Sequence, residues 1–231
     1  MSKWTHHESE SLYNIKHWGT GFFGINPEGH VEVYPDGKDA SDAKIDVPEL
    51  MEQIQKRGVS APILLRFDGL LRARVRSIFE AFDNARAEFE YEAPYRLIYP
   101  IKVNQEREVV ESLLEEGRQR GMGLEVGSKP ELVAVMTLRG GGDDSLVICN
   151  GYKDDEYIEL ALLSQKLGVT TIIVIEKFTE LETVIRKSEE IGIDPVIGVR
   201  TKLAYTGSGR WKESGGDRSK FGLTTSEIVA T

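Results

Sequence analysis

Short apolar stretches alternate with amphipathic stretches from residue 61 onward, and this alternation constrains the fold more than any other feature of the chain. The expected strands are residues 61–67, 95–101, 123–126, 145–150, 170–176 and 194–200. Continuously apolar strands separated by helices of about 10–15 residues are typical of a parallel sheet buried on both faces by helices. The pattern therefore predicts an α/β fold. Periodicity alone fits both the first part of a (β/α)8 barrel and a small doubly wound sheet.

The N-terminal part of the chain has a different pattern. Residues 1–11 are polar, and we expect them to be mobile. Short apolar runs between turn residues predict β segments within residues 12–34, and residues 47–58 predict a short helix. We therefore predict a β-rich segment over residues 1–60, followed by a second domain over residues 61–231.

Net charge and cysteine content narrow the class of protein. The formal net charge is −9 at pH 7, which argues against a broad nucleic-acid-binding surface. No apolar run approaches the roughly 20 residues of a membrane helix, and the N-terminus lacks the apolar segment of a signal peptide. The single cysteine, Cys149, excludes an intrachain disulfide and fits a reducing compartment. We expect a cytoplasmic protein without nucleic-acid or membrane partners.

Polar residues follow five successive predicted strands, close to the point where each strand ends. They are Lys102, Glu125, Asn150, Glu176 and Arg200. In both parallel architectures the active site lies at the carboxyl ends of the strands, so these side chains are expected to converge on one mouth. Each residue taken alone is better explained as a solvated loop residue. The convergence of all five is the stronger signal.

Lys102 lies in the apolar stretch YPIKVNQ. Its amine could reach solvent from a strand end. Burial in the mouth would instead lower the pKa of the amine and make its neutral, nucleophilic form available for a Schiff base. This stretch alone leaves both readings open.

Other motifs have simpler explanations. GTGFFG at residues 19–24 matches a dinucleotide-binding spacing, but a turn and a strand follow it instead of a helix. Ser128 and Glu131 fit a capping box at the start of a helix. Cys149 ends an apolar strand and is expected to fill the core. The polar, glycine-rich residues 203–222 are expected to be either a lid or a disordered segment.

Several long motifs together resemble one family. In chain order they are YNIKHWGTGFFGINPEGHVEVYP, YPIKVNQEREVVESLLEEG, GLEVGSKPELVAVM, LVICNGYKDDEYIELAL, VIEKFTEL, IGVRTKL and GSGRWKESGGDRSKFGL. These motifs resemble the biosynthetic arginine decarboxylases, which are pyridoxal-phosphate-dependent enzymes with the alanine-racemase-like barrel. The resemblance spans nearly the whole chain. It implies the N-terminal part of a (β/α)8 barrel preceded by a small β-rich segment.

The resemblance also implies roles for individual residues. Lys102 would be the lysine that bonds covalently to pyridoxal 5'-phosphate. Glu125, Ser128, Lys129 and Glu131 match an acidic–x–x–Ser–Lys–x–Glu arrangement near the cofactor, from which Glu125 and Ser128 are predicted to bind it. Arg200 matches an arginine beside the cofactor ring, and the insertion at residues 203–222 resembles the active-site loop of the family.

This chemistry has a physical basis. Decarboxylation leaves a carbanion at Cα, and the cofactor ring withdraws that charge as an electron sink. Carboxylates near the cofactor suit a guanidinium substrate, whose planar fork pairs with acids. The resemblance further implies a requirement for Mg²⁺, for which the sequence suggests no ligand set, and a homo-oligomer.

The chain departs from the family pattern by omission. The family continues with a histidine-containing strand, a glycine-rich phosphate-binding loop, an acidic partner for the pyridine nitrogen and a C-terminal β domain. We therefore expect this chain to be an N-terminal fragment that is inactive by itself.

The leading interpretation is a carboxy-lyase that converts L-arginine to agmatine and CO₂ on the route to putrescine and spermidine. A decarboxylase of ornithine, lysine or diaminopimelate is an alternative, because the residues that contact the substrate are mostly outside this chain. A non-catalytic pyridoxal-phosphate-binding barrel protein is a second alternative.

Overall fold

The computed structural model describes residues 4–138, 146–202 and 219–230. Its contacts group into two compact units, residues 1–93 and 94–231, and each is described by itself. Most of the predicted lid at residues 203–222 lies outside the described residues. The domain boundary after residue 60 stays a prediction.

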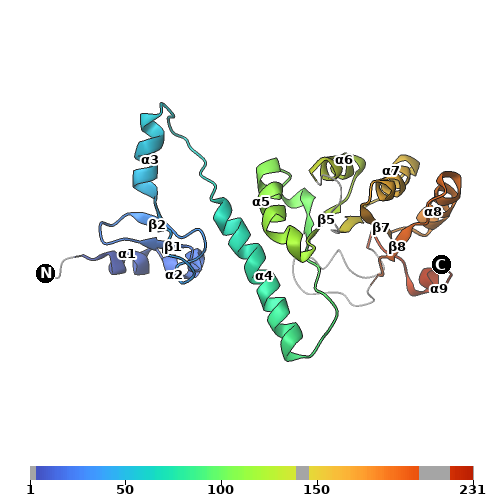
Figure 1. Ribbon diagram of the computed structural model, residues 1–231, viewed down its shortest axis with the longest axis horizontal. Coiled ribbons are helices and arrows are strands. Elements are labelled where there is room, and N and C mark those ends of the chain that lie inside the picture. Colours follow the sequence, from blue (N-terminus) through green and yellow to red (C-terminus); the bar gives the residue numbers. More distant parts are fainter. Residues whose placement is uncertain (1–3, 139–145, 203–218, 231) are drawn as a thin grey trace. The chain divides into compact units, whose positions relative to one another are not determined.

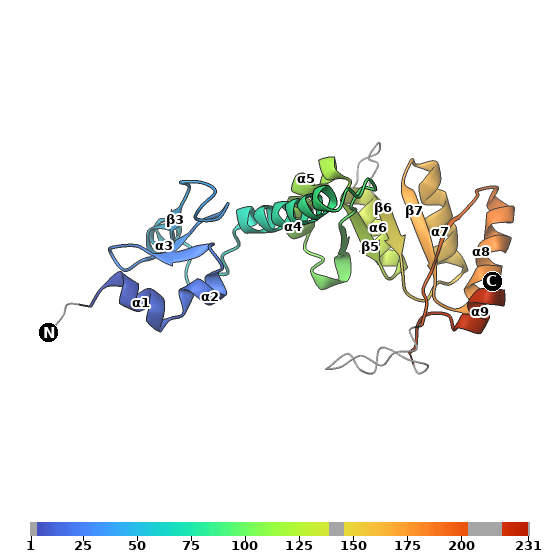
Figure 2. The same cartoon turned by 90° about the horizontal axis from the view of Figure 1, so that it is seen from below.

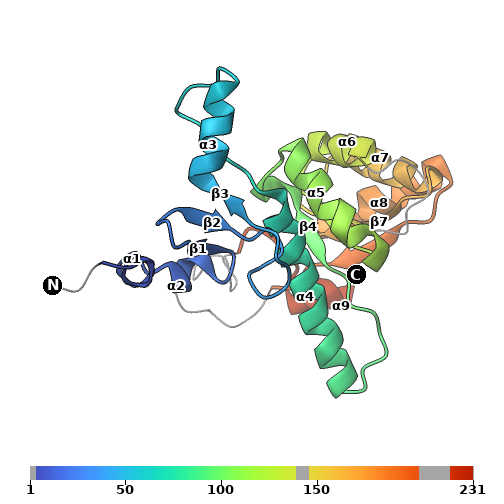
Figure 3. The same cartoon turned by 60° about the vertical axis from the view of Figure 1, so that its left-hand side comes forward.

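The first unit contains a three-stranded antiparallel sheet among its described residues (Figure 3). Its strands, in spatial order, are β1 (Phe23–Ile25), β2 (Val31–Val33) and β3 (Ile45–Asp46). A turn closed by a hydrogen bond from Gly29 N to Asn26 O joins the first two strands. Val33 is fully buried, so this small sheet has its own core. The prediction of a small β-rich segment is confirmed.

Four helices accompany this sheet. They are α1 (His6–Leu12), α2 (Ile15–Gly19), α3 (Val47–Lys56) and α4 (Asp68–Glu88). The helix predicted over residues 47–58 is confirmed as α3, which begins where the Asp46 carboxylate accepts a hydrogen bond from the Glu49 N–H.

The prediction of a mobile segment followed by a strand is corrected, because His6–Leu12 and Ile15–Gly19 form the helices α1 and α2. Thr5 and Glu8 form a capping box at the start of α1, in which each side chain binds the backbone N–H of the other residue. This reciprocal pair satisfies two backbone donors that a helix start otherwise leaves free. Glu10 then accepts a hydrogen bond from Ile25 N and fastens the helix to β1.

The strand predicted over residues 61–67 is also corrected, because this segment has no regular secondary structure. A strand needs a neighbour with which its backbone can form a hydrogen-bond ladder. Among the described residues none pairs with this segment, and Leu64 is left 78% exposed. An apolar run alone did not make a strand here.

The second unit is built on a five-stranded parallel sheet within the described residues (Figures 1 and 2). Its strands, in both chain and spatial order, are β4 (Ile98–Pro100), β5 (Gly123–Val126), β6 (Leu146–Cys149), β7 (Thr170–Ile175) and β8 (Val196–Val199). Sequential order with parallel pairing is the arrangement expected of successive βα units. The predicted sheet of about five strands is confirmed.

Helices cover one face of this sheet (Figures 1 and 3). The helical elements are the short turn η1 (Ile101–Val103), α5 (Arg107–Gly117), the short turn η2 (Arg118–Arg120), α6 (Lys129–Leu138), α7 (Asp155–Lys166), α8 (Phe178–Ile191) and α9 (Thr225–Ala230). In the described part of the chain no helix combines the length and apolar character needed to span a membrane.

The two faces of the sheet differ, whereas the sequence predicted burial of both. Side chains on one face, among them Leu124, Val147 and Ile173, are at most 1% exposed and pack under the helices. The alternate positions on the strands point to the opposite face. There, Ile148 and Val174 are only partly buried and line a cavity. This second face carries the candidate site.

Candidate active site

A cavity of about 660 Å³ lies against the uncovered face of the parallel sheet, toward the carboxyl ends of its strands. The residues that line it are Ile98, Pro100, Lys102, Glu125, Ile148, Asn150, Val174 and Arg200. The apolar members come from strands β4, β6 and β7, and the polar members gather at the strand ends. Apolar walls with a few convergent polar groups are typical of a small-molecule site.

The register of the sheet explains why these residues meet. Pro100 is paired with Glu125, and Glu125 is paired in turn with Ile148 on the next strand. Because side chains alternate along a strand, residues in register on neighbouring parallel strands share a face. Lys102 and Asn150 follow the ends of β4 and β6, which brings both to the same edge.

Lys102 lies in the short turn η1 directly after β4, which ends at Pro100, one residue before the end of the predicted strand. Its Nζ is 3.9 Å from Glu125 Oε1, and 64% of its side chain is exposed. The described residues therefore do not bury this amine, in contrast to the burial considered from the sequence. They do place it at the cavity, within reach of a ligand.

Glu125 is the most deeply buried charged group that lines the cavity, with 9% of its side chain exposed. Oε1 accepts a hydrogen bond of 2.9 Å from Asn150 Nδ2, and Asn150 N is bound at 2.8 Å to the backbone oxygen of Val126. Among the described residues, no donor reaches the buried Oε2. A buried carboxylate oxygen without a donor is costly, so this atom is poised to accept one from a ligand.

Arg200 follows the end of β8, and its guanidinium has two neighbours. Nη1 binds Glu176 Oε1 at 2.8 Å, and the guanidinium carbon lies 5.2 Å from the centre of the Phe221 ring. Glu176 is 1% exposed at its side chain and Arg200 46% exposed. Of the five polar residues predicted to converge, Glu176 is the one that does not line the cavity. Its carboxylate instead accepts the hydrogen bond from Arg200, which does line it.

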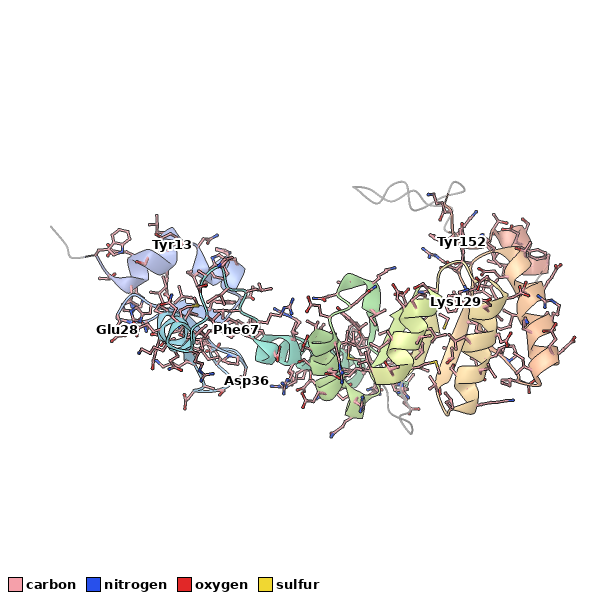
Figure 4. The ribbon with its side chains drawn as sticks, turned by 90° about the horizontal axis from the view of Figure 1, so that it is seen from above. Tyr13, Glu28, Asp36, Phe67, Lys129 and Tyr152 are labelled. Atoms are coloured by element: carbon pink, nitrogen blue, oxygen red, sulfur yellow. The ribbon has the colours of Figure 1, made fainter. Side chains whose placement is uncertain are left out.

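The residues of the GSKPE stretch are not brought to the cavity wall. Ser128 lies in the loop between β5 and α6, where its backbone oxygen accepts the first helical hydrogen bond from Leu132 N. Lys129, which is labelled in Figure 4, binds Asp154 and Glu156 at 2.8 and 2.7 Å. These two carboxylates raise the pKa of the Lys129 amine, with the Asp154 hydrogen bond as the larger cause.

The capping box predicted for Ser128 and Glu131 has a different form. The Glu131 carboxylate accepts a hydrogen bond of 2.7 Å from Gly127 N, one residue before the predicted partner. The bond still satisfies a backbone donor just ahead of the helix, which is the physical purpose of such a cap. It also ties α6 to the end of β5, next to Glu125.

Cys149 is fully buried in the core, as predicted, and burial raises the pKa of its thiol to about 12. At pH 8 only about one thiol in 10⁴ would then be the reactive thiolate, compared with about one in four for a free cysteine. We expect iodoacetamide at pH 8 to alkylate Cys149 at least 100-fold more slowly in the folded protein than in urea, a ratio that follows from the thiolate fraction. Mass spectrometry of the Cys149 peptide measures this rate. Equal rates in the two conditions would contradict the burial.

Two buried residues near the site were missed from the sequence. Lys153 follows β6 and has a fully buried side chain, and Glu180 lies in the first turn of α8 with 4% exposure. In the sequence both resemble solvated residues of polar stretches, because nothing in the neighbouring residues shows that they are partners. Their positions just after two strands could have indicated that both lie at the carboxyl edge of the sheet.

The donor set of the cavity fits pyridoxal phosphate, which the sequence resemblance implies. The accessible amine of Lys102 can add to an aldehyde, and the free Oε2 of Glu125 can accept a hydrogen bond from a ring substituent. The guanidinium of Arg200 suits an anionic neighbour. A metal site has no comparable support, because the described residues contain no group of three His, Cys, Asp or Glu side chains that could hold an ion.

Known proteins have sequences similar to this chain. The chain is 50% identical to a biosynthetic arginine decarboxylase of Phocaeicola vulgatus and 48% identical to one of Rhodopirellula baltica, in each case over 99% of the chain. These alignments cover 36% and 34% of the two relatives, so the chain spans about a third of their length.

Solved structures show the same fold. The crystal structure of a biosynthetic arginine decarboxylase from Campylobacter jejuni has a TM-score of 0.80 and 30% identity, and it is matched over 94% of this chain and 34% of its own. A diaminopimelate decarboxylase from M. jannaschii has a TM-score of 0.63 and 17% identity, over 92% of this chain and 43% of its own, which shows a shared fold alone.

A family model fixes the assignment. The model described as pyridoxal-dependent decarboxylase, pyridoxal binding domain, matches residues 75–231, which include the whole parallel sheet and every residue that lines the cavity. The chain therefore belongs to the family of pyridoxal-dependent decarboxylases, and its residues 75–231 match their pyridoxal-binding domain.

Proposed function

We propose that this chain forms the cofactor-binding part of an enzyme that decarboxylates L-arginine to agmatine and CO₂. The identity of about half of all positions with biosynthetic arginine decarboxylases, over 99% of the chain, carries this proposal. The agmatine produced would serve the synthesis of putrescine and spermidine. The further proposals below concern the residues of the cavity.

Lys102 is the residue that bonds to the cofactor. The position of its amine at the mouth, 3.9 Å from a carboxylate oxygen, supports this role. Its exposure leaves the amine accessible to the cofactor, and the apolar side chains of Ile148 and Val174 line the same cavity. The neighbouring Glu125 carboxylate would accept a proton from the amine or stabilise its positive charge.

Glu125 orients the cofactor, and Asn150 fixes the carboxylate of Glu125. The hydrogen bond from Asn150 Nδ2 occupies Oε1 and leaves Oε2 directed to a ligand donor. A carboxylate held in one rotamer by a neighbour keeps its geometry as the ligand changes, which is the value of such preorganisation.

Arg200 stabilises negative charge at the cofactor, and Ser128 contributes a polar contact from the loop after β5. For Arg200, support comes from its place on the cavity wall and from the Glu176 carboxylate behind it. For Ser128, support comes from the sequence resemblance and from its position two residues beyond β5. When bound, pyridoxal phosphate supplies the electron sink that accepts the charge left at Cα by loss of CO₂.

The direct test uses the full-length protein, pyridoxal phosphate and four substrates: arginine, ornithine, lysine and diaminopimelate. We expect visible absorbance from the bound cofactor and release of CO₂ with arginine, at a kcat/KM at least about 10²-fold above that of the other three. Preference for another of these amino acids would overturn the substrate proposal but keep the enzyme class. Cofactor absorbance without CO₂ from any of them would favour a non-catalytic binding protein.

We further propose that the full-length enzyme is a cytoplasmic homo-oligomer that requires Mg²⁺. These three proposals rest on the sequence resemblance, and no described residue is assigned as a metal ligand. Treatment with EDTA followed by assay with and without added Mg²⁺ tests the metal requirement, and light scattering of the purified protein tests the oligomer.

A further inference from the structure

The carboxylate of Glu180, in the first turn of α8, is the centre of a buried polar cluster at the carboxyl edge of the sheet. Oε1 accepts a hydrogen bond of 2.9 Å from Lys153 N, and Oε2 accepts one of 2.8 Å from Glu176 N. Oε2 also lies 3.3 Å from the amine of Lys153. One side chain thus binds the loop after β6 and the end of β7 together.

Lys153 lies wholly within this cluster. Its side chain is fully buried, and its amine also donates a hydrogen bond of 2.6 Å to the backbone oxygen of Gly151. Removing a charged amine from water is unfavourable unless it gains a countercharge and hydrogen bonds, and both are present here. A buried pair of this kind is weak evidence of net stability, so the geometry that it fixes is the property of interest here.

That geometry leads directly to Arg200. The N–H of Glu176 is held by Glu180, and its backbone oxygen accepts a hydrogen bond of 3.0 Å from Gly222 N. With its backbone N–H and C=O both hydrogen-bonded, Glu176 is held on each side of its Cα, and its buried carboxylate binds Arg200 Nη1 at 2.8 Å. The guanidinium therefore has a defined direction even though nearly half of the Arg200 side chain is exposed.

We propose that Glu180, with Lys153 as its countercharge, is a positioning residue that fixes the Arg200 guanidinium at the cavity through Glu176. Glu180 and Lys153 do not line the cavity and act only through this chain of contacts. The expected effect on cofactor binding rests on the proposed role of Arg200. The expected effect on the backbone of Glu176 is independent of that role.

The first measurement is hydrogen exchange of the full-length protein without cofactor. Glu180→Gln keeps the size of the side chain but removes its charge, and we expect the amide of Glu176 to exchange at least about tenfold faster. The matched control is Glu159→Gln, which removes the charge from a different carboxylate–lysine pair, the one that Glu159 of α7 forms with the partly exposed Lys187 of α8. This control should leave the Glu176 amide unchanged. Unchanged exchange in Glu180→Gln would overturn the inference.

The second measurement is a double-mutant cycle on the dissociation constant for pyridoxal phosphate. We expect Glu180→Gln to raise this constant about tenfold in the native background and less than about twofold in the Arg200→Lys background, because residues on one chain of contacts are not additive. Additive effects would show that Glu180 acts by some other route and would overturn the inference. A role in stability alone would not produce this dependence on Arg200.

The inference stays testable if Glu180→Gln does not fold or if the protein binds no pyridoxal phosphate. If Glu180→Gln does not fold, Glu180→Asp keeps the charge, shortens the side chain and should shift both measurements in the same direction by a smaller amount. A native protein that binds no pyridoxal phosphate would contradict the proposed function. The exchange of the Glu176 amide, with the position of Arg200 in a crystal structure of the variant, would then decide this inference.

Discussion

Lys102→Ala in the full-length protein is expected to abolish the visible absorbance of the bound cofactor and to lower arginine decarboxylation by at least about 10³-fold. The reason is chemical: alanine has no amine with which to bond the cofactor aldehyde. The position is also specific, because the Lys102 amine lies at the cavity and is 3.9 Å from Glu125 Oε1. Absorbance spectroscopy and CO₂ release measure the two effects independently.

Lys166→Ala provides the control for this prediction. Lys166 is an exposed lysine at the C-terminal end of α7, so it lies at the opposite edge of the sheet from the cavity. The control should keep both absorbance and activity within about twofold of the native protein, as expected of a surface substitution away from any site. If Lys102→Ala kept native decarboxylation, the assignment of Lys102 would be wrong. Loss of both signals in the control would indicate a general loss of folded protein instead.

The effect of Lys102→Ala on stability should be small, which separates chemistry from folding. The side chain is largely exposed and its contact with Glu125 is long, so little packing is lost. Although Glu125 is buried, the pair is long and its lysine is open to water, so its loss should cost no more than about 1 kcal/mol. The thermal unfolding midpoint of the cofactor-free variant should therefore match that of the native protein.

The parallel sheet was predictable because its strands are continuous apolar runs and each is followed by a helix that covers it. β5 and β7, for example, were found nearly at their observed bounds. Residues 61–67 show the limit of the same signal, because their apolar run finds no partner strand among the described residues. The start of α1 shows a different limit: Thr5 and Glu8 carry a capping-box signature that was present in the sequence and was not used.

The candidate site was predictable only where position along a strand determines function. Lys102, Glu125 and Arg200 were found because a parallel sheet brings its carboxyl ends to one edge. Lys153 and Glu180 could not be found in this way, since they are 27 residues apart and each resembles a solvated loop residue. Their pairing depends on how the loop after β6 packs against the first turn of α8, which hydrophobic periodicity does not report.

The loops after β5 and β6 approach each other closely at Gly151, so of the glycines at the mouth Gly151 should tolerate substitution least. Its φ is +78°, and a Cβ added there would lie 2.4 Å from the backbone oxygen of Gly127. Gly168 has the same φ of +78° but no atom within 4 Å of an added Cβ. The two glycines therefore share the backbone strain that a larger residue would suffer and differ only in the clash.

We expect Gly168→Ala to lower the free energy of unfolding by about 1 kcal/mol, which is the cost of placing alanine in the left-handed region. Gly151→Ala should lower it by about 3 kcal/mol or more, since two loop backbones must separate in addition. Urea unfolding of the full-length variants followed by tryptophan fluorescence measures both values. Equal losses in the two variants would show that the close approach to Gly127 does not exist in solution.

The same pair of variants also links loop packing to the cavity. Gly151 follows Asn150, whose amide holds the Glu125 carboxylate at 2.9 Å, so a displaced loop would release Glu125 from its fixed rotamer. At a temperature where both variants stay folded, Gly151→Ala should weaken pyridoxal phosphate binding by about tenfold, and Gly168→Ala by less than about twofold. If cofactor affinity fell equally in both, it would follow global stability. A loss confined to Gly151→Ala would show instead that contact between the loops after β5 and β6 sets the geometry of the site.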